Sequence, residues 1–339
     1  MKKTFLWMIC GLLSLKAAAQ QKPHYTQYIL NQYILNPALS GIENYTDIKI
    51  SHRQQWTGIE GAPVTTYLTV HTPIGKDDYR TTATSFAVPG ENPRGSRYWE
   101  SYTAAAPHHG AGLQVINDRT GPLNAFAAYL TYAYHLGLSA TTSIAAGFGA
   151  GINSIALDAS RLRFGQVTVD PAVYGSGELQ KLKPDLTAGL YLYSSDFFAG
   201  LSAQQILPQK IDFSNNTVKK EEGRMVPHLF ATAGYRLLLT EDINLIPSVL
   251  VKYIQPVPVQ FDINAKIQYR DLLWVGGSYR KSDGVSGMVG LNISNTLNIG
   301  YAYDHSTSPL RNYSNGTHEF VLGFLLGNRY SDSCPRNIW

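Results

Sequence analysis

The sequence predicts an all-β fold: a transmembrane antiparallel β-barrel of about fourteen strands, preceded by an N-terminal lead-in or plug segment. Three observations support this prediction. Apolar and polar residues alternate along many segments, charged residues make up only 15% of the chain, and no run after residue 20 reaches the roughly eighteen consecutive apolar residues of a transmembrane helix. Because backbone polar groups inside a bilayer must bond within a helix or around a closed barrel, strands are the remaining way to span it.

Residues 1–19 are predicted to be a secretory signal peptide, so we expect an exported protein. Lys2 and Lys3 give a positive start, an apolar run covers 4–15, and alanines at 17–19 offer a cleavage site. Removing Lys2, Lys3 and Lys16 from the 28 Lys and Arg residues leaves 25 basic against 24 acidic residues. This nearly neutral mature chain has no charge imbalance that would favour a nucleic-acid partner.

Residues 20–44 precede the first predicted strand and are rich in tyrosine and in amide side chains. A disordered leader would carry fewer aromatic residues. We therefore expect an ordered lead-in that plugs the lumen or lies against its mouth.

Alternation is clearest over residues 257–270. The odd-numbered residues from Val257 to Tyr269 are apolar, and the even-numbered ones from Pro258 to Arg270 are mostly polar. Since successive side chains of a strand point to opposite faces, one face is apolar and the other polar. One such strand fits a soluble sandwich as well as a barrel, but a complete set favours the barrel. Fourteen segments are predicted as strands: 45–56, 64–73, 110–118, 123–136, 141–153, 186–194, 197–205, 227–239, 243–254, 257–269, 272–281, 285–293, 296–304 and 317–326. Glycines such as Gly147 and Gly300 would permit bends and close approach within the curved sheet.

The connections predict the orientation of a barrel that spans residues 45–327. With the N-terminus in the periplasm, tight turns at 195–196, 241–242, 271 and 294–295 face the periplasm, and longer segments near 154–185, 206–226 and 305–316 face outward, as in outer-membrane barrels. The segment 75–109 breaks this rule and is predicted as a periplasmic insertion, either a partner-binding feature or a tolerated insertion. Residues 328–339 form a tail whose Cys334, the single cysteine left after signal removal, is expected to be unpaired.

Several short motifs occur in a fixed order along nearly the whole mature chain. The first group is Tyr25-Thr26-Gln27-Tyr28, Asn36-Pro37-Ala38 with Gly41, and His52-Arg53-Gln54-Gln55-Trp56 with Gly61-Ala62-Pro63. The second group is Val115-Ile116-Asn117-Asp118-Arg119-Thr120-Gly121-Pro122, Ala150-Gly151-Ile152-Asn153, Pro247-Ser248 before Lys252-Tyr253, Gly300-Tyr301-Ala302-Tyr303-Asp304, and Gly316-Thr317-His318-Glu319. In these motifs the chain resembles the PorP/SprF family of type IX secretion system outer-membrane proteins. It departs from the family pattern in the segment 75–109, which the family usually keeps short.

The resemblance implies an outer-membrane barrel of the type IX secretion and gliding motility machinery that associates with other secretion components. It also implies a secreted, adhesin-like cargo protein, recognised through a C-terminal sorting domain and exported or anchored at the cell surface. The alternative is an outer-membrane transport channel for a small or hydrophobic solute, gated by the lead-in. Recovery of a large secreted or periplasmic protein with the barrel would favour the first hypothesis.

The residues of the opening motifs are the candidate contacts. These are Asn36, Pro37, His52, Arg53, Gln55 and Trp56, which either touch a partner directly or fix the plug against the barrel wall. Trp56 and Trp274, with tyrosines at strand ends, are predicted to lie in the interface belts of the bilayer.

The polar face of 257–270 supplies the candidate lumen residues Asp262, Lys266 and Arg270. They either form an interior salt-bridge network or line a selective path. We expect no enzymatic activity, cofactor or metal. His108 and His109 are adjacent and would point to opposite faces of a strand, whereas a zinc site needs three or four converging protein ligands.

Overall fold

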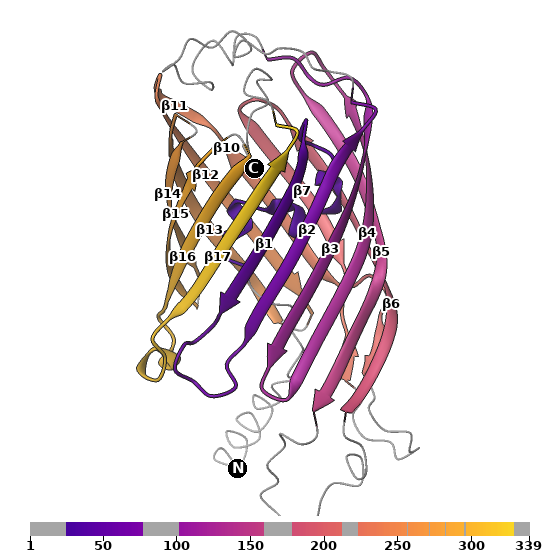
Figure 1. Cartoon of the computed structure of the whole chain (residues 1–339), viewed down its shortest axis with the longest axis vertical. Helices are drawn as coiled ribbons and strands as arrows, with labels where there is room; N and C mark the ends of the chain where they lie inside the picture. Colours follow the sequence, from indigo (N-terminus) through magenta and orange to yellow (C-terminus); the bar gives the residue numbers. More distant parts are fainter. Residues whose placement is uncertain are drawn as a thin grey trace, which may run out of the picture.

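The computed structural model is a closed antiparallel β-barrel around a short N-terminal segment (Figure 1). It describes residues 25–76, 102–158, 178–211, 223–255, 257–270, 272–281, 283–294 and 296–328. The predicted signal peptide, most of the predicted insertion at 75–109 and nearly all of the predicted tail lie outside these residues.

The wall strands follow one another along the chain. In order they are β1 (Thr46–Gln54), β2 (Val64–Ile74), β3 (His108–Thr120), β4 (Leu123–Gly137), β5 (Ser143–Asp158), β6 (Glu178–Tyr193), β7 (Phe197–Gln204), β10 (His228–Tyr235), β11 (Leu237–Thr240), β12 (Ile243–Ile254), β13 (Val257–Tyr269), β14 (Leu273–Arg280), β15 (Gly284–Asn292), β16 (Leu297–Ser306) and β17 (Thr317–Leu326). A separate two-stranded sheet pairs β8 (Gln209–Ile211) with β9 (Gly223–Met225), and a 3-10 turn, η6 (Pro309–Asn312), lies between β16 and β17.

The sheet closes on itself, which confirms the predicted fold class. Strand β1 pairs with β17, so the first and last wall strands are neighbours. Both β10 and β11 pair with β12, and only Arg236 separates them, so together they occupy one position in the wall. The wall therefore has fourteen strand positions, each overlapping one of the fourteen predicted segments.

Burial along the strands is the reverse of that in a soluble protein. In β13 the even-numbered residues from Asp262 to Gln268 are buried and the odd-numbered ones from Ile263 to Tyr269 are exposed. Large apolar side chains such as Leu130 (70% exposed) and Phe320 (57% exposed) point away from the barrel. This pattern suits a lipid-facing exterior and a polar lumen, because a soluble fold would bury the apolar face.

The two ends of the barrel differ in their connections. At one end, here called the turn end, β6 joins β7 through residues 194–196 and β11 joins β12 through 241–242. At the other, the loop end, β1 joins β2 through 55–63 and β16 joins β17 through 307–316. Short connections also occur at the loop end, at 121–122 and 281–283, and the long connection 75–107 joins β2 to β3 at the turn end. The predicted orientation, with short turns in the periplasm and longer loops outside, would put the loop end at the cell surface. Part of the predicted outer loop 154–185 is strand, because β5 extends to Asp158 and β6 begins at Glu178.

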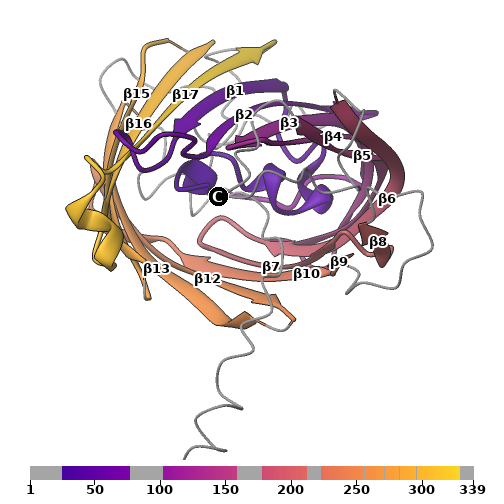
Figure 2. The ribbon, with the colours of Figure 1, turned by 90° about the horizontal axis from the view of Figure 1, so that it is seen from below.

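The lead-in enters the lumen as three single 3-10 turns: η1 (Gln27–Ile29), η2 (Gln32–Ile34) and η3 (Pro37–Leu39). Seen along the barrel, these turns lie inside the ring of strands (Figure 2). The structure thus places the lead-in inside the lumen and not at its mouth. Among the described residues, no helix is long and apolar enough to cross a membrane.

Candidate functional site

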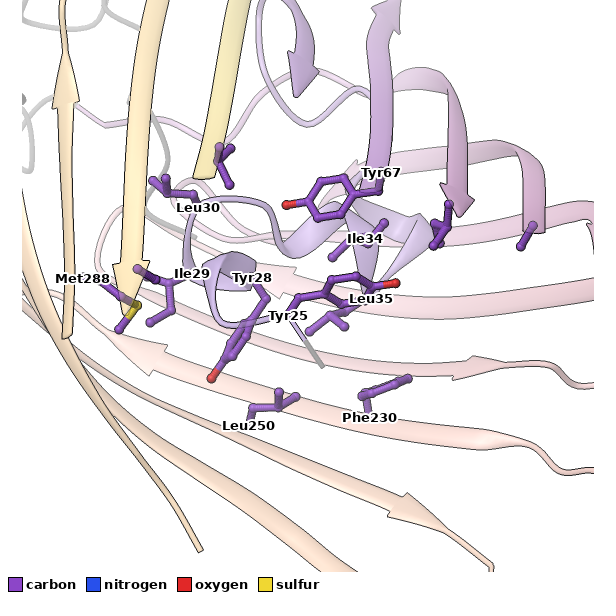
Figure 3. Close-up of a cluster of buried hydrophobic side chains, with 14 of the residues drawn as sticks. Tyr25, Tyr28, Ile29, Leu30, Ile34, Leu35, Tyr67, Phe230, Leu250 and Met288 are labelled. Carbon is purple, nitrogen blue, oxygen red and sulfur yellow. The ribbon is translucent and has the colours of Figure 1, made fainter. Parts of the chain in front are cut away.

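The lead-in is the centre of the candidate site because it fills the lumen. Every residue from Tyr25 to Glu43 is buried. Its apolar side chains belong to two clusters. One includes Ile29 and Leu35 with inward-facing wall residues such as Leu250 and Met288 (Figure 3), and the other includes Leu39. The lumen therefore contains a small hydrophobic core, to which both the lead-in and the wall contribute side chains.

Asn36 ties the lead-in to the wall between β6 and β7. Its side-chain oxygen accepts a hydrogen bond from the backbone N–H of Ala38 (3.0 Å) and so caps η3. Its side-chain nitrogen donates to the carbonyls of Leu190 (3.0 Å) and Leu201 (3.3 Å). A Cβ on Gly189 would lie 2.0 Å from the Asn36 Oδ1, so glycine there makes the room this contact needs.

Wall side chains also satisfy the carbonyls that short 3-10 turns leave open. Gln114 Nε2 donates to the Tyr33 carbonyl (2.6 Å), and Ser202 Oγ donates to the Leu35 carbonyl (2.6 Å). Gln204 Nε2 lies 2.9 Å from the carbonyls of both Ile34 and Leu35. Buried backbone groups need such partners, so the polar lumen face fixes the path of the lead-in.

A charged cluster holds the first turn of the lead-in. The register of the closing strand pair places Arg53 of β1 opposite Glu319 of β17. The Arg53 guanidinium, whose side chain is only 3% exposed, pairs with Glu319 (2.9 Å) and with Asp304 (2.6 Å). Thr26 joins both carboxylates, because its N–H donates to Glu319 (2.8 Å) and its hydroxyl donates to Asp304 (2.7 Å). Removing one partner from a buried ion pair leaves an uncompensated charge and is strongly destabilising, so this anchor requires all its members.

Histidines hold the other end of the lead-in, near the turn end. His135 Nε2 lies 2.8 Å from the Ser40 carbonyl, and the backbone N–H of Gly41 donates to His71 Nδ1 (3.3 Å). His108 stacks on His135 with ring centroids 4.4 Å apart, whereas His109 is exposed and contacts Tyr132 on the outer face. The two adjacent histidines therefore point to opposite faces, as predicted.

The structure separates the six predicted contact residues. Asn36 and Arg53 anchor the lead-in, and Pro37 begins η3 against Gly147, where a Cβ would lie 2.5 Å from the Pro37 carbonyl carbon. His52 is exposed on the outer face of β1, where it contacts Thr66 (2.9 Å). Gln55 and Trp56 follow β1 and line a cavity at the loop end.

Among the predicted lumen residues, Asp262 and Lys266 are buried, and Asp262 pairs with Arg280 of β14 (3.1 Å). The prediction for Arg270 is wrong. It lies in the turn after β13 with its side chain 40% exposed and pairs with Asp242 (2.8 Å). The hydrogen bond from Arg270 lowers the pKa of the Asp242 carboxyl below its ordinary value.

The predicted interface position of Trp274 is also wrong. Its side chain is 4% exposed and faces the lumen, where Lys266 Nζ lies 6.0 Å from the ring. A Cβ on Gly290 would lie 2.3 Å from this indole, so the ring fills the space beside a glycine of β15. Trp274 thus belongs to the core around the lead-in.

A cavity of about 400 Å³, here called the vestibule, lies among residues at the loop-end termini of the strands. Its lining includes Arg53, Trp56, Asp118, Arg280 and Lys281. The sequence predicted no site role for Arg280 or Lys281, and Asp118 occurred there only within a family motif. Alternation along the strand could have assigned Arg280 to the lumen face. It lies two residues after Ser278, so both side chains point to the same face, and both are buried.

Comparison with known proteins gives one family match. A family model described as "Type IX secretion system membrane protein PorP/SprF" matches residues 17–324. No curated protein matches the chain.

Solved structures similar to this chain are barrels at low sequence identity. The structure "CymD monoaromatic hydrocarbon channel" has 10% identity and a TM-score of 0.48, covering 90% of this chain and 94% of that one. The outer membrane protein Omp33 of Acinetobacter baumannii has 8% identity and a TM-score of 0.44, covering 85% of this chain and 100% of that one. A Pseudomonas aeruginosa FadL homologue has 10% identity and a TM-score of 0.43, covering 89% and 93%.

Proposed function

The chain belongs to the PorP/SprF family of type IX secretion system membrane proteins, and from this premise we propose that it holds a secreted partner protein at the loop end of a plugged outer-membrane barrel. The partner would be an adhesin-like cargo that carries a C-terminal sorting domain. Holding it there would assist its export or its attachment at the cell surface, in a secretion or gliding assembly with other type IX components. The role is one of binding, without catalysis.

The observation that carries this proposal is the complete burial of the lead-in from Tyr25 to Glu43. A solute crossing the lumen would have to displace a segment that Asn36 and Arg53 fix to distant parts of the wall. A shut lumen leaves the rim and loops as the surface where a partner can act. The alternative, a transport channel for a small or hydrophobic solute, requires that these anchors release.

The partner proposal is tested by copurification from detergent-solubilised outer membranes of cells that express the full chain with an affinity tag. We expect a large secreted or periplasmic protein to be recovered, and we expect its display on the cell surface to fall when the barrel gene is deleted. If the barrel purifies alone, and deletion lowers solute uptake while surface protein display is unchanged, the channel alternative is correct.

Two substitutions sharpen this test. Trp56→Gly removes a vestibule side chain and suits the backbone, because Trp56 has a φ of 45° that glycine adopts without strain. It should reduce recovery of the partner. His52→Ala, four residues earlier and on the outer face of β1, should leave recovery unchanged. Equal recovery with both variants would argue against the loop end as the contact surface.

A further inference from the structure

Charged side chains meet around the vestibule because of strand register. On neighbouring strands, Asp118 is opposite Thr65, Thr65 is opposite Arg53, and Arg53 is opposite Glu319. Since adjacent strands are about 4.8 Å apart, the backbone positions of Asp118 and Glu319 are separated by about 14 Å along the wall. The acidic residues therefore start from separate strands around the cavity.

The carboxylates around the vestibule outnumber the cations. Arg53 pairs with two carboxylates, and so does Arg280. Lys281 is exposed and lies 5.3 Å from the ring of Phe261. Among the described residues, the lining itself contains three cations and three carboxylates: Arg53, Arg280 and Lys281 with Asp118, Asp283 and Asp304. Its ion-pair partners add two carboxylates, Asp262 and Glu319, and Asp262 also interacts with the cation Lys252, so the whole set carries a surplus of one negative charge.

Two acceptors in this lining have no donor among the described residues. Asp304 Oδ1 and Gln260 Oε1 are buried without a hydrogen-bond partner among the described residues, and Arg53 Nε is the open donor of the same lining. Asp118 accepts from the hydroxyls of Thr65 (2.6 Å) and Thr120 (3.5 Å) and forms no ion pair within the described part of the chain. Leaving buried acceptors and unneutralised carboxylates without partners costs free energy.

We propose that the vestibule receives the cationic side chain of a lysine or arginine from an extended segment of the partner protein. An ammonium or guanidinium group brings several donors and a positive charge, which match the open acceptors and the surplus of carboxylates. A long side chain can reach these groups while its aliphatic stem lies against Trp56 and Pro63 of the lining. This inference rests on the proposed function, because it assumes a protein partner at the loop end.

The direct test is binding of a short peptide to the full-length barrel purified in detergent. The probe is a fluorescently labelled peptide, Gly-Gly-Lys-Gly-Gly, and its comparison is the same peptide with glutamine in place of lysine. Fluorescence polarisation should show binding of the lysine peptide, weakened by salt because charges are screened, and much weaker binding of the glutamine peptide.

Two variants should shift this affinity in opposite directions. Asp118→Asn keeps an acceptor for the Thr65 hydroxyl but removes a negative charge, so the lysine peptide should bind roughly fivefold more weakly. Lys281→Gln removes a cation that repels the probe, so binding should tighten by a few fold. Asp242→Asn is the matched control, since Asp242 lies in a turn at the other end of the barrel. Each variant is first checked for the heat-sensitive gel migration of a folded barrel.

Three results would overturn the inference. The first is equal binding of the two peptides, and the second is an affinity for the lysine peptide that changes by the same factor and in the same direction in Asp118→Asn and Lys281→Gln. The third is competition by free spermidine at far lower concentration than by unlabelled lysine peptide. The last result would assign the site to a free polyamine. The outcome is separable from the copurification test. If wild type and Asp118→Asn recover the partner equally, the proposed function stands and this site is ruled out. If the lysine peptide binds but no partner is recovered, the vestibule is a cation site and the proposed function is ruled out, together with the partner as its occupant.

Discussion

Replacing Arg53 by methionine should destabilise the folded barrel by about 3–5 kcal/mol, the usual cost of removing one partner from a buried ion pair. Methionine keeps the length of the stem but loses the charge. Glu319, which is 0% exposed, and Asp304 would then remain as buried carboxylates without their guanidinium. The hydrogen bond from Arg53 to the Thr26 hydroxyl (2.9 Å) would also be lost.

These losses do not simply add, because all three contacts belong to one network. Glu319→Gln leaves Arg53 its pair with Asp304 and should cost less, about 1–3 kcal/mol. The double variant Arg53→Met/Glu319→Gln should lose less stability than the sum of the two single losses, because a neutral glutamine at 319 leaves no unpaired charge beside the methionine. This non-additivity distinguishes a charge network from two independent packing defects.

Urea unfolding of the full-length protein in phospholipid vesicles measures these differences, with tryptophan fluorescence as the signal. Trp274 faces the lumen core and should report loss of the barrel interior. His52→Ala is the control, because it alters the neighbouring residue on the opposite face of β1 and should change stability by under about 1 kcal/mol. A loss below about 1 kcal/mol for Arg53→Met would show that water, and not Arg53, compensates these carboxylates.

Three further substitutions test the plug and the membrane face. Gly110→Val would place a Cβ 1.8 Å from the Ser40 carbonyl oxygen, so it should displace the lead-in and raise ion conductance in planar bilayers; Gly287→Val, where nothing lies within 4 Å, should leave conductance unchanged. Asn36→Ala removes the cap of η3 and two bonds to the wall and should cost about 1–2 kcal/mol in urea unfolding; an unchanged midpoint would contradict the anchor. Leu130→Arg puts a charge at the middle of β4 on the outer face and should cost about 2–4 kcal/mol in vesicles; the absence of a penalty would mean that this face does not meet lipid.

The wall could be predicted from the sequence because its signal is local. Alternation of apolar and polar residues within a strand, as in β13, indicates which residues share a face without any information about the neighbouring strands. Strand ends are harder, which explains the error at Arg270. It continues the polar series of Asp262 and Lys266, but the chain turns there with a φ of 48° and the side chain leaves the lumen.

The anchors could not be predicted in the same way, because their members come together only through the closed register. Arg53 lies 251 residues from Asp304 and 266 from Glu319, and their meeting depends on β1 pairing with β17. The predicted interface position of Trp274 is wrong because alternation fails as a signal there. Its neighbours Leu273 and Val275 are also apolar, so alternation does not indicate which face it occupies.

Four glycines of the wall lie in close contact with the lead-in, where a larger side chain would clash with it. The sequence predicted that Gly147 and Gly300 permit bends or close approach within the sheet. In the structure a Cβ at Gly147 would lie 2.3 Å from the Ala38 nitrogen, and one at Gly300 would lie 2.5 Å from a methyl group of Leu30. Gly189 and Gly110 make room in the same manner for Asn36 and Ser40. Because these glycines occur on β3, β5, β6 and β16 and face the same short segment, the wall is shaped to the lead-in, and the plugged barrel is the state that this wall fits.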